Sequence, residues 1–331
     1  MPRLSPEEMA TIPFITNPPQ DGRALILLPF YDDRLDDWFT YVVLPTGKLG
    51  RLAGGKLHSG IYLSRQPEQP ERDVDFFLGT FIVQHVSFDA VARSFLPLKN
   101  NLHYFSAALE KLGMFSSKGV EPSSASLLVE SELAYLTIIV RRFYDLLQAV
   151  CKAASGLVKD VNDTTRRLFR NLPDSFNDVV SFRNRPRTAE EIVKKWALAP
   201  PIVDFYAREA NHFLLVREIR NAIDHHGHSA GLVVRHARGM AIALDDQPWA
   251  NLPIWNDQTT QANNLGSVRA IFAYLIADAL DLGSRFVNSY WSCIATPQAI
   301  APGFRCFFRD PFSHHLNSLA TILKTPWESA Q

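Results

Sequence analysis

The feature that most constrains the fold of this chain is a long, almost uncharged helical pattern in its middle. From Leu127 to Val158 the apolar residues recur with helical spacing, and from Leu133 to Val150 only Arg141, Arg142 and Asp145 are charged. A helix that is apolar around most of its circumference has to be covered on several sides. The pattern therefore predicts a helical bundle, completed either by this chain alone or by a second subunit.

Shorter patterns precede this helix. The predicted elements are strands at Ala24–Phe30 and Phe39–Leu44 and helices at Asp73–Ser94 and Leu98–Leu112, which are divided near Pro97. The stretch Gly113–Ser126 is rich in Ser, Gly and Pro, which favours a linker, and Ser126 is the expected cap of the long helix. We expect a smaller mixed α/β region of unknown role over residues 1–115 and a mainly helical domain over residues 126–331.

The second half of the chain predicts more helices and one β-hairpin. Helices are expected at Thr188–Ala197, from Pro200 onward and at Asn264–Ile294. Between the last two, β-branched residues alternate around a glycine from Gly231 to Leu244, as in a hairpin. The expected fold class is α+β, mainly α: a helical bundle with a β-hairpin insertion, preceded by a smaller α/β region.

The composition is that of a globular protein, with 47% hydrophobic and 21% charged residues. No apolar run approaches the roughly 20 residues that span a bilayer, and the N-terminus lacks the apolar core of a signal peptide. The three cysteines are far apart, which indicates neither a disulfide framework nor a thiolate zinc site. We expect a cytoplasmic protein that needs no membrane and no cofactor.

Basic residues concentrate locally although the formal net charge is zero. Residues 141–240 contain 17 Lys and Arg against 11 Asp and Glu. This excess suits a local phosphate contact better than a long electrostatic groove. The expected phosphate or RNA contacts are Arg141, Arg142, Arg183, Arg185 and Arg187, and a solvated basic face is the alternative.

The helix that begins at Pro200 ends in a cluster of polar residues. Helical spacing places Arg220 on the apolar stripe formed by Val216, Ile219 and Ile223. A guanidinium on an apolar face needs a partner or a ligand. Asp224, one turn later, could pair with it, and so could a bound phosphate.

His225 follows five residues after Arg220, which is about 140° further around a regular helix. The two side chains would converge only if the helix unwinds before Gly227 or if a second chain contributes one of them. Arg217, Asn221 and His225 form an alternative stripe on one face, and His226 is an alternative histidine.

The histidines do not predict a metal site. His225, His226 and His228 have no ligand spacing of a known zinc motif, so no metal is expected there. The alternative is a metal-dependent hydrolase that uses this histidine cluster, to which His236 could add a ligand if the hairpin brings it close. His212 and the pair His314-His315 have no companion pattern and are expected to be structural.

The residue types at this helix end suit RNA cleavage. A histidine transfers protons near neutral pH, and an arginine holds a phosphate through its bidentate fork. Attack by the 2′-hydroxyl would leave a 2′,3′-cyclic phosphate, would need no metal and would spare DNA. Arg220 and His225 are the expected catalytic pair, and Asn221 would orient the phosphate or the imidazole.

The run from Arg220 to His225 resembles the R-(polar)-x-x-x-H motif of the HEPN superfamily, the higher-eukaryote and prokaryote nucleotide-binding domains. In that resemblance Arg220 matches the arginine, Asn221 the polar residue and His225 the histidine. Arg141-Arg142-Phe143-Tyr144-Asp145 also looks like part of a HEPN core helix. Gly227 departs from the family variant that carries a tyrosine two residues after the histidine.

The resemblance covers residues 126 to about 294 and implies a HEPN-like bundle that dimerises with its motifs facing one another. It implies a metal-independent endoribonuclease in prokaryotic phage defence or a toxin–antitoxin system, with RNA as substrate and an antitoxin or regulatory protein as a possible partner. The alternative is a non-catalytic HEPN-type module that binds RNA, nucleotide or protein.

Overall fold

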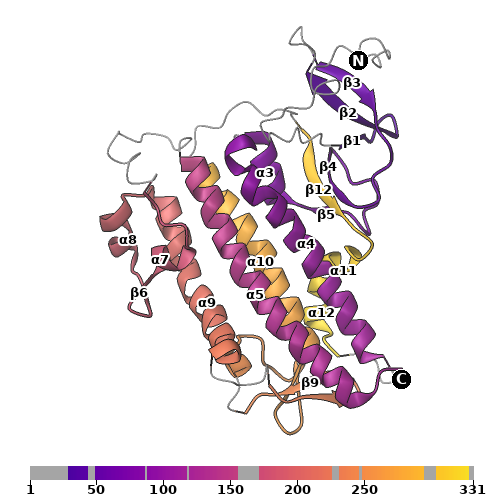
Figure 1. Cartoon of the computed structure of the whole chain (residues 1–331), viewed down its shortest axis with the longest axis vertical. Coiled ribbons are helices and arrows are strands. Elements are labelled where there is room, and N and C mark those ends of the chain that lie inside the picture. Colours follow the sequence, from indigo (N-terminus) through magenta and orange to yellow (C-terminus); the bar gives the residue numbers. More distant parts are fainter. Residues whose placement is uncertain are drawn as a thin grey trace.

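The computed structural model describes residues 29–43, 49–85, 88–117, 119–155, 171–225, 231–245, 248–293 and 303–327. Within these ranges long helices lie side by side, with a six-stranded sheet at one end and a four-stranded sheet at the other (Figure 1). The long helices are α4 (Phe88–Ser116), α5 (Pro122–Ala154), α9 (Pro200–His225) and α10 (Val268–Trp291). The fold is mixed α and β and mainly helical, as the sequence predicts.

The long apolar pattern forms α5. Its cap is Glu121, whose carboxylate accepts the backbone N–H groups of Ser123 (3.0 Å) and Ser124 (2.8 Å), so the predicted cap at Ser126 is wrong. Among the described residues, α5 is the one helix long and apolar enough to cross a membrane by length and composition alone. It packs against α4, α9 and α10, with Leu133 and Leu136 fully buried, which is the arrangement of a core helix.

Helix α4 continues through Pro97, so the predicted break there is also wrong. The chain divides earlier, between α3 (Phe77–His85) and α4. Proline removes one hydrogen bond from a helix. Burial of Phe95, Leu98 and Leu102 at 0% exposure on one face of α4 holds the helix together across that position.

A strand from the end of the chain completes the N-terminal sheet. The sheet order is β3-β2-β1-β4-β12-β5. Its strands are β1 (Pro29–Asp32), β2 (Asp37–Val43), β3 (Leu49–Ala53), β4 (Gly60–Ser64), β5 (Val74–Asp75) and β12 (Arg305–Arg309). Strand β12 pairs antiparallel with β4 and β5, and one hydrophobic core includes residues from this sheet and from the long helices. The regions predicted as 1–115 and 126–331 therefore share a sheet.

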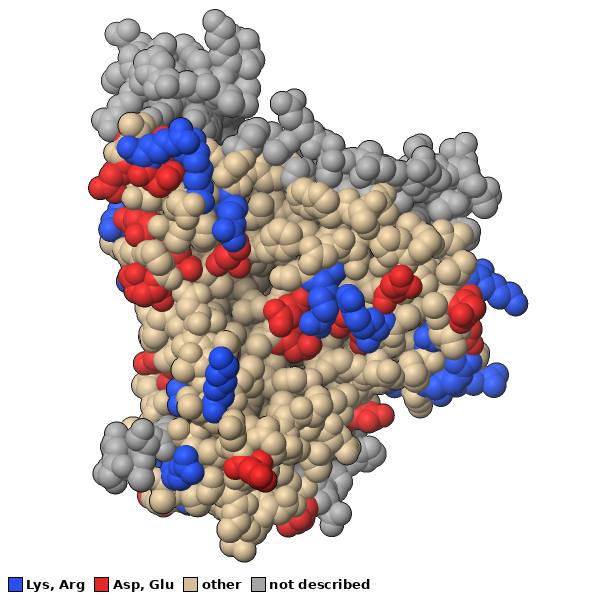
Figure 2. All heavy atoms as spheres, turned by 180° about the vertical axis from the view of Figure 1, so that it is seen from behind, with Lys and Arg blue, Asp and Glu red and all other residues tan. Residues whose placement is uncertain are grey.

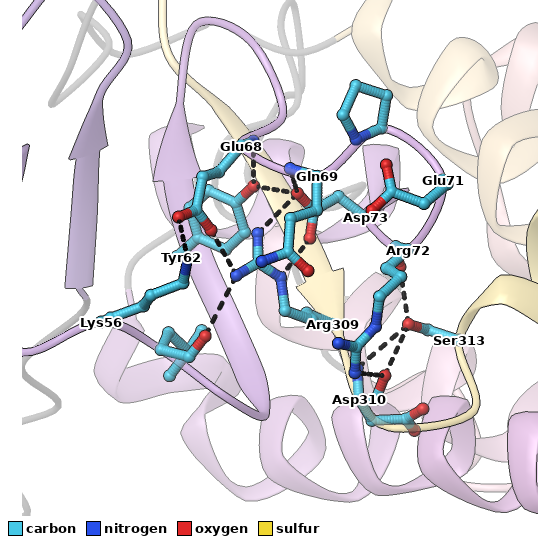
Figure 3. A network of polar contacts seen from close by, with 12 residues as sticks. Lys56, Tyr62, Glu68, Gln69, Glu71, Arg72, Asp73, Arg309, Asp310 and Ser313 are labelled. Atoms are coloured by element: carbon cyan, nitrogen blue, oxygen red, sulfur yellow. Dashed lines mark hydrogen bonds and ion pairs between the residues drawn. The ribbon is translucent and has the colours of Figure 1, made fainter. Parts of the chain in front are cut away.

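A buried arginine fixes this shared sheet (Figure 3). Arg309, at 1% exposure, donates from Nε to Asp73 Oδ1 (2.5 Å) and from Nη2 to Asp73 Oδ2 (2.7 Å), while its Nη1 reaches Glu68 (2.5 Å). Asp73 also accepts from the Tyr62 hydroxyl at 2.7 Å. Because the guanidinium is fully paired with protein groups, this network is a structural tie and not a ligand site.

The other elements lie at the far end and along one side of the helices. The sheet β10-β11-β9-β8 contains β8 (Val233–His236), β9 (Gly239–Ala243), β10 (Thr260–Gln261) and β11 (Leu265–Ser267), next to a short 3-10 helix at Pro248–Asn251. Strands β8 and β9 confirm the predicted hairpin. The last helices among the described residues are α11 (His314–Asn317), which packs on α4, and α12 (Leu319–Lys324), which packs on α10.

On the opposite side, a small helix–hairpin–helix unit packs on α9 (Figure 1). It consists of α7 (Phe176–Val180), β6 (Ser181–Phe182), β7 (Arg185–Pro186) and α8 (Ala189–Trp196). Helix α8 begins with a capping box, in which Thr188 and Glu191 satisfy each other's backbone N–H groups. This unit places the predicted basic loop against the motif helix.

Candidate functional site

The motif helix α9 stays helical through His225. Its backbone therefore places positions 217, 221 and 225 on one face, with Arg220 on another. Arg220 is half-buried between the buried Val216 and Ile219 and is not a free cation. The side chains of Asp224 and His225, and all of His226 and Gly227, lie outside the described residues.

Arg217 joins the motif helix to the basic loop. Its Nη1 donates to Asn177 Oδ1 on α7 (2.9 Å), and its Nη2 donates to Asn184 Oδ1 in the hairpin turn (3.0 Å). These two amides hold the guanidinium plane at the mouth of a cavity that the same residues line. Of the predicted motif residues, Arg217 is the one whose described side chain faces this cavity.

The β6–β7 turn presents an arginine in an unusual backbone conformation. Arg183 (φ 51°) and Asn184 (φ 63°) both adopt the left-handed region, as the two central residues of a type I′ hairpin turn do. Asparagine tolerates this region, whereas a left-handed arginine costs roughly 1–2 kcal/mol. Arg183 adopts this unfavourable conformation beside a cavity, and residues that depart from local backbone preferences often lie at functional sites, so Arg183 is a candidate functional residue.

The basic side chains of the loop surround one exposed ring. Phe182 is 42% exposed, and the guanidinium carbons of Arg183 and Arg187 lie 5.1 and 5.0 Å from its centroid. On the buried side, Arg187 and Lys195 lie 5.3 and 4.5 Å from the Trp196 ring. Exposed cation–π contacts are worth only about 0.5–1 kcal/mol, so a ligand can exchange with them.

These residues line a cavity of about 510 Å³, called here the basic cleft. It brings together four cations, one carboxylate, three amides and two aromatic rings. The lining residues are Asn171, Pro173, Asn177, Asp178, Ser181, Phe182, Arg183, Asn184, Arg187, Lys195, Trp196 and Arg217. Seen from behind, acidic and basic side chains alternate over the middle of the molecule, and basic ones gather toward the edge that carries α8 and the β6–β7 hairpin (Figure 2).

The other predicted phosphate contacts do not line this cleft. Arg185 forms a bidentate pair with Glu191 (2.9 and 2.5 Å), and that hydrogen bond lowers the pKa of Glu191 to about 2. Arg141 donates to Asp145 at 2.6 Å and packs over the ring of Phe213. Asp145 in turn accepts the backbone N–H of Phe176, the first residue of α7, so Arg141 helps to hold α7 in place. Arg142 is exposed on α5 and is not part of the cavity lining.

Within the described residues no histidine lines the basic cleft. His212, on α9, instead belongs to a polar network inside the bundle: its Nδ1 lies 2.7 Å from the Tyr144 hydroxyl and 3.0 Å from Asp278 Oδ2. Arg285 pairs with both Asp278 and the buried Glu209. This network joins α5, α9 and α10, which agrees with the structural role expected for His212.

The sequence does not predict that several of these residues line the cleft. Asn177 lies on α7, and Lys195 and Trp196 lie on α8, so no pattern in the sequence connects them with the basic loop. The loop itself gave a usable signal, since three arginines alternate with other residues from Arg183 to Arg187.

No family model matches the sequence, and no curated protein or solved structure is significantly similar to the chain.

Proposed function

We propose that this protein binds single-stranded RNA in the basic cleft. The observation that carries the proposal is the convergence of four cations on one cavity with a single carboxylate. Guanidinium groups bind phosphate through two parallel hydrogen bonds, and positively charged grooves with stacking rings bind unpaired nucleotides. Arg183 and Arg187, which now flank Phe182, would turn to the phosphates as a base stacks on the exposed ring.

The shape of the cleft favours an unpaired strand over a duplex. A volume of about 510 Å³ is within the usual range of small-ligand pockets and is large enough for one nucleotide. The amides of Asn171, Asn177 and Asn184 supply both donors and acceptors for a ribose or a base edge. Bases in a duplex are stacked on each other and are not free to stack on Phe182.

As a second step, we propose that the bound RNA is cleaved without a metal ion. The supporting observation is that Arg217, which lies in the cleft, shares one face of α9 with Asn221 and position 225. Positions 217 and 225 are about 12 Å apart along the helix axis. A strand anchored at Arg217 can follow this face. His225 would then take the 2′-hydroxyl proton, and an arginine would stabilise the phosphorane.

The regular helix favours an assembly of two chains for this chemistry. Position 225 lies about 140° from Arg220 around α9, so these two positions of one chain do not share a face. A homodimer in which one chain supplies Arg220 and the other chain supplies His225 would bring an arginine and a histidine together at one phosphate. The HEPN-like bundle, the cytoplasmic location and a role in phage defence or toxin–antitoxin function belong to this same proposal.

The test is to incubate purified protein and end-labelled single-stranded RNA in EDTA. We expect retention of the RNA and cleavage to 2′,3′-cyclic phosphate ends, with cleavage lost in His225→Ala and Arg220→Ala, and retention weakened in Arg217→Ala. Arg142→Ala, an exposed arginine outside the cleft, is the matched control and should behave as wild type. Retention without cleavage would support the non-catalytic alternative, and no retention would refute both steps.

A further inference from the structure

We propose that Glu110, His314 and His315 form a site for a divalent zinc ion. Within the described residues these three side chains offer one carboxylate oxygen and two imidazole nitrogens, all within 4.8 Å of one another. Two histidines and one glutamate form a known ligand set for zinc in proteins, with the fourth position taken by water or another ligand. The site lies at α4 and α11, on the other side of the long helices from α8 and the basic cleft (Figure 1).

The two histidines depart from the usual behaviour of neighbours on a helix. Consecutive helical side chains point about 100° apart. His314 and His315 instead have ring centroids 4.0 Å apart, at the start of the four-residue helix α11. Two imidazole rings placed this close together can direct their nitrogens toward one cation.

Glu110 completes the set from a rigid element. It lies near the C-terminal end of the 29-residue helix α4, and its Oε2 is 2.7 Å from His315 Nε2. An ion pair between Glu110 and His315 alone would explain that distance but not the position of His314. Tetrahedral zinc at about 2.1 Å from each ligand atom would hold these atoms roughly 3.4 Å apart. The 2.7 Å between Glu110 Oε2 and His315 Nε2 is a hydrogen-bond distance, so zinc would replace that hydrogen bond and separate the two atoms by roughly 0.7 Å, while His314 already lies within reach as the third ligand.

A second layer of hydrogen bonds holds α11 in place beside α4. Asp310, just before α11, accepts from the Ser106 hydroxyl (2.6 Å) and lies 3.0 Å from His103 Nδ1. The hydroxyl of Ser313, the residue before His314, accepts the backbone N–H of Asp310 and donates to the carbonyl of Arg72 (Figure 3). His103, Ser106 and Glu110 lie on one face of α4, so a single helix face positions the segment and supplies a ligand.

The site borders a cavity that can supply a fourth ligand. His315 lines a cavity of about 190 Å³, together with Ser267, Arg238 and Arg269. This volume holds water and a small anion. His315 thus joins the proposed site to this cavity, from which a water molecule or a small anion could complete the coordination.

The test uses the full chain, stripped with EDTA, dialysed and titrated with zinc against a chromophoric chelator. We expect one tight equivalent in wild type, a zinc-dependent rise in Tm, and the visible absorption of a four-coordinate site when cobalt replaces zinc. His314→Gln is the first variant, because His314 is exposed and its replacement should leave folding intact. Removing a ligand should weaken zinc binding at least about 100-fold, since second-layer changes alone cost roughly 10–100-fold.

A double variant, His226→Gln with His228→Gln, is the matched control because it removes two of the three histidines of the other cluster and leaves His225, the proposed catalytic residue, in place. It should bind zinc as wild type does, and Glu110→Gln and His315→Gln should lose binding while keeping the wild-type Tm in EDTA. The proposal is overturned if wild type binds no stoichiometric zinc. It is also overturned if tight binding survives in His314→Gln, or if tight binding disappears in the control. RNA retention in EDTA is independent of either result.

Discussion

Replacing Arg183 by glycine should separate RNA binding from stability. Glycine relieves the left-handed conformation at φ 51°, a gain of roughly 1–2 kcal/mol. It loses a cation–π contact of about 0.5–1 kcal/mol with Phe182 and adds about 0.5–1 kcal/mol of backbone entropy to the unfolded chain. These contributions nearly cancel, so the free energy of unfolding should change by less than about 1 kcal/mol.

RNA binding should fall at the same time. If all four cleft cations contact phosphates, log K should vary with log salt with a slope of about −2.8, because each contact to a single strand contributes about −0.7. Affinity would then drop roughly 50-fold between 50 and 200 mM salt. Arg183→Gly leaves three contacts, a slope of about −2.1 and a drop of roughly 20-fold.

Fluorescence anisotropy with a labelled oligoribonucleotide at several salt concentrations measures both slopes, and urea unfolding measures the stability. Asn263→Gly is the matched control, since Asn263 is also left-handed (φ 62°) and exposed but lies in the β10–β11 turn and carries no charge. An Arg183→Gly slope equal to that of wild type would refute the assignment of Arg183 to the phosphate backbone.

Three further changes test other parts of the structure. Lys195→Ala should also lower the salt slope by about 0.7, because it removes one cleft cation; an unchanged slope would remove Lys195 from the proposed interface. Arg309→Met should destabilise the protein by about 3–5 kcal/mol in urea unfolding, because it leaves the carboxylate of Asp73 buried without its counter-ion; a loss below about 1 kcal/mol would contradict the structural tie. The Arg185 hydrogen bond lowers the pKa of Glu191 from 4.5 to about 2, so the stabilisation from this carboxylate is complete above about pH 5 and is lost as pH falls toward 2. The Tm difference between wild type and Glu191→Gln should therefore shrink over that range. A difference that grows on acidification would show that the ionised carboxylate of Glu191 does not stabilise the folded state.

The elements with strong local patterns could be predicted from the sequence. The apolar residues of α5 and α10, the Pro200 start of α9 and the glycine-centred hairpin β8–β9 each depend on neighbouring residues, which a sequence displays directly. The predicted cap at Ser126 was wrong because a local signal lies one turn earlier: Glu121 caps the helix and Pro122 begins it. The predicted break at Pro97 was wrong because tertiary burial outweighed local propensity.

Contacts between distant residues could not be predicted. Arg309 and Asp73 are 236 positions apart, and His315 and Glu110 are 205 apart, so no local pattern connects them. The same limit applies to the basic cleft: its arginine loop is visible in the sequence, but Lys195 and Asn177 join it only through packing on α9. The sequence also could not show that Arg185 pairs with Glu191, whereas its neighbours Arg183 and Arg187 line the cleft.

The most direct test of the central claim, that the basic cleft binds single-stranded RNA, is ultraviolet crosslinking of bound RNA followed by peptide mapping. The exposed Phe182 ring is the stacking surface of the proposed cleft, so crosslinks should fall on the Phe182–Arg187 loop and disappear when unlabelled RNA competes. Crosslinks confined to other peptides, such as the β8–β9 hairpin, or no specific crosslink at all, would contradict the account.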